Sequence, residues 1–177
     1  MLRYLLLKPT RCFRVKSIRH PVTFLLYALL ATSAFARVGE PLARLKEHFG
    51  KAPEAGAPKN MAVWIIESID GALIYTVTLN DKGVSIAEGI KPLKRGLLTT
   101  QIAQDFLRDQ SFAIKDSKTA RVVPAGGKYV FAGQSFVCGA NESVIVDDVN
   151  GLLIIWSRDN PPSVMAVTRE MLLRAGG

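Results

Sequence analysis

The sequence is poor in the reactive side chains on which most enzymes and metal sites depend. Its 177 residues include only two cysteines and two histidines. Beyond residue 36, Cys138 is the only thiol and His48 the only imidazole. Structural zinc, which takes four Cys or His ligands, is therefore excluded. A disulfide within residues 37–177 is excluded too, because a single thiol has no partner there.

Two catalytic motifs and a membrane span are also missing. Gly126-Gly127 lacks the further glycine spacing and the Lys-Ser/Thr pair of a phosphate-binding loop, and no G-x-S-x-G occurs. The uncharged stretch PVTFLLYALLATSAFA has 16 residues, whereas a spanning helix needs about 20. We therefore expect no stable membrane span in the processed chain; a retained anchor is the alternative.

Residues 1–36 have the layout of a cleavable signal peptide. The first twenty residues carry no acid and six basic residues, namely Arg3, Lys8, Arg11, Arg14, Lys16 and Arg19. An apolar run over residues 24–31 and the small-residue site Ala34-Phe35-Ala36 follow, which predicts cleavage before Arg37. Transit peptides are also Arg-rich at the start but are amphipathic, which the unbroken apolar run is not. The pattern predicts export, to the periplasm or outside the cell.

The charge of the chain is concentrated in this leader. The formal net charge is +8, from 23 basic and 15 acidic residues. Removing residues 1–36 leaves 17 basic residues against the same 15 acids, a net charge of +2. A high pI that comes from an export signal does not indicate nucleic-acid binding, so no nucleic-acid partner is predicted.

The remaining residues, 37–177, have the length of one domain and the patterns of an α+β fold. We expect two short helices, at about 41–49 and 100–109, and antiparallel β-meanders. The expected strands are MAVWIIES, ALIYTVTL and VSIAEGI, then YVFAGQSFVC at 129–138, SVIVD, GLLIIWS and SVMAVT. Asp70-Gly71 predicts a two-residue type I′ turn. The tail REMLLRAGG either extends the last strand or forms a helix.

An internal similarity suggests two αβββ-like halves, 37–96 and 97–177. Residues 65–84, IIESIDGALIYTVTLNDKGV, align at an offset of 80 residues with residues 145–164, IVDDVNGLLIIWSRDNPPSV. Turn residues as well as strand lengths match, since Asp70-Gly71 meets Asn150-Gly151.

The start of the processed chain resembles a known type of small exported domain. Gly39, Leu45 and the run Phe49-Gly50-Lys51-Ala52-Pro53 are similar to the helix-ending G…LG-x-P motif of outer-membrane assembly lipoproteins and the β-lactamase inhibitory protein. The match covers about fifteen residues, has one extra residue before the proline and lacks the lipid-bearing cysteine of the lipoproteins. The resemblance implies a binding or assembly module built of helix-plus-meander units.

The candidate catalytic groups each have a structural alternative. Glu67, Asp70, Asp147 and Asp148 would form an acid site if the two meanders faced each other, but Asp and Asn are also the residues that turns require. We favour the turn interpretation and leave Asp148 as the one open candidate. For Cys138 and His48, a core thiol and a helix-end imidazole are favoured over a catalytic pair. No catalytic, cofactor-binding or metal-binding residue is therefore predicted.

These observations favour a small exported module without catalytic activity that binds a protein or an envelope component through a sheet face or a loop. The alternative is an acid-dependent hydrolase that uses carboxylates near the hairpin turns. A third hypothesis, a structural envelope protein, requires self-association.

Overall fold

The computed structural model describes residues 37–94, 97–111 and 118–175. These residues belong to one compact unit. The predicted signal peptide and its cleavage site, residues 1–36, lie outside the described residues. None of the described helices is both long and apolar enough to cross a membrane.

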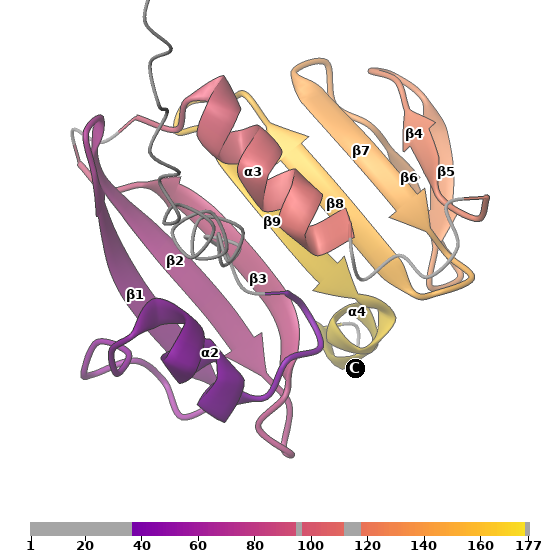
Figure 1. Cartoon of the computed structure of the whole chain (residues 1–177). Coiled ribbons are helices and arrows are strands. Elements are labelled where there is room, and N and C mark those ends of the chain that lie inside the picture. Colours follow the sequence, from indigo (N-terminus) through magenta and orange to yellow (C-terminus); the bar gives the residue numbers. More distant parts are fainter. Residues whose placement is uncertain (1–36, 95–96, 112–117, 176–177) are drawn as a thin grey trace, which may run out of the picture. The chain divides into compact units, whose positions relative to one another are not determined.

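The structure is α+β and antiparallel throughout, which confirms the predicted fold class (Figure 1). A seven-stranded sheet has the order β1-β2-β3-β9-β8-β7-β4, and β5 and β6 form a separate two-stranded hairpin. The strands are β1 (Met61–Ser68), β2 (Gly71–Leu79), β3 (Ser85–Pro92), β4 (Arg121–Val123), β5 (Lys128–Phe131), β6 (Gln134–Val137), β7 (Glu142–Asp147), β8 (Leu152–Ser157) and β9 (Ser163–Thr168).

Both predicted helices are present, and the tail forms a third. The helices are α2 (Leu42–Phe49), α3 (Thr100–Ser111) and α4 (Arg169–Ala175). Helix α2 ends because Gly50 takes the left-handed conformation, with φ of 63°, and its N–H group donates to the Glu47 carbonyl. The open question about the tail is thus resolved in favour of a helix.

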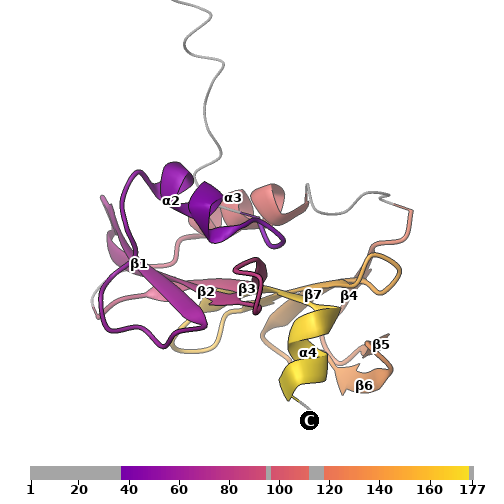
Figure 2. The ribbon, with the colours of Figure 1, turned by 90° about the horizontal axis from the view of Figure 1, so that it is seen from below.

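The two faces of the sheet are covered differently (Figure 2). Helices α2 and α3 lie on one face, over a core that includes the fully buried Trp64, Tyr75 and Phe106. Helix α4 and the β5–β6 hairpin lie on the opposite face. The hairpin buries Phe131 there, in a second cluster with Val144 and Val146 of β7.

Strands β1–β3 form one meander and β7–β9 a second, and the first hairpins of the two meanders have the same pairing register. Ala62 pairs with Val77 in the β1–β2 hairpin, and Glu142 with Ser157 in the β7–β8 hairpin, an offset of 80 residues in both strands. Each meander follows a helix, with β4, β5 and β6 inserted between α3 and β7 in the second half. The meanders join where β3 pairs antiparallel with β9, so they lie side by side in one sheet.

The predicted single strand at 129–138 is wrong. It is a hairpin, in which Phe131 pairs with Gln134 across a turn formed by Ala132 and Gly133. Both turn residues have positive φ, 52° and 78°, which is the requirement of a type I′ turn. An alanine seldom adopts this conformation, so the turn lacks the Asn-Gly, Asp-Gly or Gly-Gly pair that usually marks a type I′ turn in a sequence.

The predicted type I′ turn at Asp70-Gly71 is also wrong in detail. Ser68 pairs with Gly71, so the two loop residues are Ile69 and Asp70. Only Gly71, with φ of 99°, is left-handed, whereas a type I′ turn needs positive φ at both central residues. A turn followed by a left-handed glycine is the alternative geometry of short hairpins.

Replacing Phe106 with Ala tests the packing of α3 on the sheet. Phe106 is fully buried and lies 6.0 Å from the ring of Tyr75, between ring centroids. We expect Phe106→Ala to lower the free energy of unfolding by about 3–5 kcal/mol. Leu173→Ala, at a 60 % exposed position of α4, is the control and should change it by less than about 0.5 kcal/mol. Urea unfolding measures both, and equal losses would contradict this packing.

Candidate functional site

The four acids proposed from the sequence do not form one site. Glu67 and Asp70 lie at the turn between β1 and β2, and Asp147 and Asp148 at the turn between β7 and β8. Because all neighbouring strands are antiparallel, the order β1-β2-β3-β9-β8-β7 puts these two turns at opposite ends of the sheet (Figure 1). The condition for an acid site, two meanders facing each other, is therefore not met.

Asp147 closes its own turn. Its side chain is fully buried and accepts hydrogen bonds from the Asn150 backbone N–H (3.1 Å) and side-chain Nδ2 (2.7 Å). Burial alone would raise the pKa of Asp147, but the hydrogen bonds from Asn150, Thr119 and Val149 outweigh it and hold the pKa below its ordinary value. Asp147 is thus a charged turn acceptor, as the turn interpretation expects.

Asp148, the one open candidate, links three parts of the fold. Its Oδ1 accepts from the Ala132 N–H (3.1 Å) in the β5–β6 turn and lies 3.1 Å from an Nη of Arg169 at the start of α4. The same Arg169 nitrogen donates to the Asp148 backbone carbonyl. The carboxylate therefore braces the unusual Ala132-Gly133 turn, which accounts for it without catalysis.

Cys138 and His48 lie on opposite faces of the sheet. Cys138 is buried in the cluster under the hairpin, with its sulfur 3.7 Å from the carbonyl oxygens of Val123 and Glu142. Burial, and then the charge of Glu142, raise the pKa of this thiol, which makes it a poor nucleophile. His48 belongs to α2 on the other face (Figure 2), so the two residues form no pair.

A buried carboxyl group, which no sequence motif marks, lies between α3 and the sheet. Glu88 of β3 is 2 % exposed and accepts hydrogen bonds at Oε2 from the Tyr75 hydroxyl and from Gln110 Nε2 (3.0 Å). Gln110 Oε1 in turn accepts from the Val38 N–H at 2.9 Å. Glu88 Oε1 is buried without a hydrogen-bond partner. The network ties the start of the domain to α3 and to β3.

Glu88 is inaccessible, so we assign it a structural role. Burial raises the pKa of the Glu88 carboxyl above its ordinary value, against the lowering effect of hydrogen bonds from Tyr75, Ser85 and Gln110, and the charge of Glu40 raises it further. Burial and the proximity of Glu88 also raise the pKa of Tyr75. In the described residues, no group of three or more His, Cys, Asp or Glu side chains is arranged to hold a metal ion.

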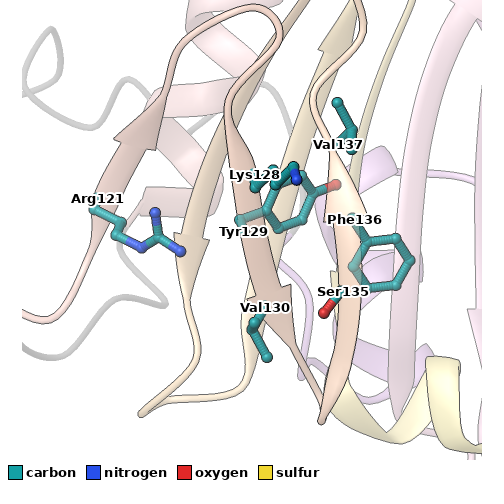
Figure 3. A pocket seen from close by; sticks show the side chains of 7 residues that line it. All are labelled: Arg121, Lys128, Tyr129, Val130, Ser135, Phe136 and Val137. Atoms are coloured by element: carbon teal, nitrogen blue, oxygen red, sulfur yellow. The ribbon is translucent and has the colours of Figure 1, made fainter.

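An accessible feature without an assigned role is the outward face of the β5–β6 hairpin (Figure 3). Cross-strand pairs Lys128–Val137 and Val130–Ser135 form this face, because Tyr129 and Phe131 point inward and are buried. Val137 and Val130 are 62 % and 49 % exposed. We call these four residues, with Arg121 of β4, the hairpin surface.

The hairpin surface is hollowed and carries positive charge. A cavity of about 550 Å³ is lined by its five residues together with Tyr129 and Phe136, whose rings stack at 5.4 Å between centroids. Figure 3 shows Arg121 reaching from β4 toward β5. Among the described residues, neither Arg121 nor Lys128 forms an ion pair. The sequence pattern does not indicate this surface, because it predicts a single strand where the hairpin lies.

Alanine substitutions at Asp147 and Asp148 separate their structural roles. Asp147→Ala should lower the free energy of unfolding by about 1–3 kcal/mol, because buried donors of the turn lose their acceptor. Asp148→Ala removes a half-exposed ion pair and should cost no more than about 1 kcal/mol. The pKa of Asp147 is lowered in the folded protein. Its contribution to the free energy of unfolding is therefore fully present above the ordinary Asp pKa of about 3.9 and is lost as the pH falls below that value. Urea unfolding at pH 7 and pH 3 checks both points; a larger loss for Asp148→Ala would contradict them.

Glu88→Gln tests the buried carboxyl through the pH dependence of stability. Because the folded-state pKa of Glu88 is raised, its stabilising contribution is full below the ordinary Glu pKa of about 4.3 and is lost as the pH rises through the raised value. The variant, which cannot ionise, should therefore gain stability relative to the wild type as the pH rises from 4 to 8. Thermal unfolding across this range gives the difference. A difference that stays constant with pH would show that Glu88 ionises normally.

Comparison with known proteins adds no relative from which a role could be transferred. The chain matches no protein-family model, and searches of curated proteins and of solved structures return no match.

Proposed function

We propose that the chain is an exported, non-catalytic module that binds another protein through the hairpin surface. The observation that carries this proposal is the combination of two exposed valines and Lys128 on the hairpin with Arg121 on β4. Neither cation forms an ion pair among the described residues. Exposed apolar side chains next to polar or charged ones are typical of protein interaction sites.

The roles of the other polar groups support binding over hydrolysis. Asp147 and Asp148 are engaged in holding turns, and Glu88 is buried in the core. Cys138 is buried and His48 lies on the other face of the sheet. Export of the processed chain and the helix-plus-meander resemblance, both predictions from the sequence, point in the same direction.

Crosslinking from the hairpin surface tests the proposal. A photocrosslinking amino acid placed at position 137 should capture one defined protein of the exported fraction. Ile69, an exposed aliphatic residue at the β1–β2 turn, provides the control position at the opposite end of the sheet from the β7–β8 turn. We expect the double variant Val130→Asp, Val137→Asp to weaken this interaction at least about tenfold, a loss in the range of interface hot spots.

The control variant Ile69→Asp should leave the interaction unchanged, although it adds a charge at an even more exposed aliphatic position. Equal capture from positions 69 and 137, or no capture from position 137, would contradict a binding role for the hairpin surface.

A further inference from the structure

The outer edge of β1 is blocked against strand addition. Outward-facing carbonyl groups of β1 accept hydrogen bonds from the preceding loop: Val63 O from the Glu54 N–H at 2.7 Å, and Ile65 O from Lys51 Nζ at 2.7 Å. The Met61 N–H donates to the Pro58 carbonyl at 2.8 Å. The opposite edge strand of the sheet, β4, has only three residues. Covered and very short edges are two of the ways in which proteins prevent unwanted pairing.

The outer edge of β6, which is one residue longer than β4, is not covered by any backbone hydrogen bond among the described residues. In the described part of the chain, β6 pairs with β5 alone. The sequence of β6, QSFV, contains no charged residue and no proline, which are the other common protective features. An extended backbone edge is therefore open to solvent on the strand that also carries half of the hairpin surface.

The ladder of the hairpin shows which groups this edge presents. The Cys138 N–H donates to the Gly127 carbonyl at 2.9 Å. Since hydrogen-bonded and non-hydrogen-bonded pairs alternate along an antiparallel ladder, Lys128–Val137 and Val130–Ser135 are the non-hydrogen-bonded pairs. The backbone N–H and C=O groups of Ser135 and Val137 thus point away from β5, toward the open edge.

The side chains next to this edge favour an acidic partner. Val137 lies opposite Lys128 on the outward face of the hairpin. On the inward face, half-buried Phe136 flanks the edge and stacks on Tyr129. Outward side chains of an added strand would lie beside Val137, one strand away from Lys128, where acidic side chains are favoured. Its inward side chains would lie beside Phe136, where apolar side chains are favoured.

We propose that β6 is a strand-addition site for an extended segment of another protein, with acidic and apolar residues in alternation. This inference rests on the proposed function and specifies the chemistry of the partner. Main-chain hydrogen bonds to Ser135 and Val137 supply the pairing, as in other cases of strand addition, and Lys128 selects for carboxylates. A second copy of this chain fits less well, because β6 offers only Gln, Ser, Phe and Val and so brings no carboxylate to Lys128.

The probe is a synthetic eight-residue peptide of alternating glutamate and valine, added to the processed protein. Its binding should shift the amide NMR signals of Ser135 and Val137 and weaken as salt is raised. A peptide of alternating lysine and valine should bind at least about tenfold more weakly. Absence of binding, or equal binding of both peptides, would overturn the proposal.

Variants at Ser135 isolate the backbone contribution. Ser135→Pro removes an outward N–H group without removing a bond of the hairpin, and should weaken peptide binding at least about tenfold. Ser135→Ala keeps the N–H group and should bind as the wild type does. If the proline variant fails to fold, Val137→Asp, which places an anion beside the outward-facing carboxylates of the peptide, should give the same loss. Unchanged binding in the folded edge variants would contradict strand addition.

Self-association gives a further check, because pairing of two β6 edges would make the protein dimerise. Light scattering over a range of concentrations should show a monomer whose mass does not change in Ser135→Pro. A dimer lost in this variant would overturn the proposal of a foreign partner.

If crosslinking from position 137 captures a protein while the glutamate–valine peptide does not bind, the proposed function stands and strand addition is wrong. If the peptide binds but no protein is captured, the proposed function is contradicted, and the proposal of a foreign protein partner for β6 fails with it.

Discussion

The pairing of β3 with β9 determines most of what this fold can do. Four residue pairs, from Ala87–Val167 to Ile90–Val164, join two meanders of equal hairpin register into one sheet. Because this pairing is antiparallel, α2 and α3 share one face while the first turns of the two meanders lie at opposite ends. This topology prevents an acid site between the meanders. The inserted segment β4–β6 belongs to the second half of the chain and has no counterpart in the first half.

The conspicuous polar residues stabilise this arrangement. Asp147 accepts hydrogen bonds within its own turn. Asp148 accepts a hydrogen bond from the Ala132-Gly133 turn, 16 residues away in the sequence. Glu88 connects β3 to α3 and, through Gln110, to Val38 just after the predicted cleavage site. In each case the neighbours of the carboxyl group explain its presence, and the pKa direction follows from them.

The sequence predicted the features that local pattern controls. Helix boundaries followed from Gly50 and from apolar spacing, and six of the strands lay in β-branched runs. It failed where distant contacts override local preference. Ala132 takes a left-handed conformation that alanine disfavours, and a hydrogen bond to Asp148 stabilises it. The residue preferences of turns therefore do not predict the β5–β6 hairpin. The candidate site was missed with it, since strand edges and outward faces depend on which strand pairs with which.

The proposed binding site is a short hairpin with an unpaired edge, two exposed valines and nearby cations. Residue-resolved amide hydrogen exchange of the processed protein alone tests this claim most directly. Phe136, which faces β5 in a hydrogen-bonded pair, should exchange slowly, whereas Ser135 and Val137 should exchange nearly as fast as unstructured amides. If the Ser135 and Val137 amides are as protected as that of Phe136, the edge is already occupied within the protein and the account of a free binding edge is wrong.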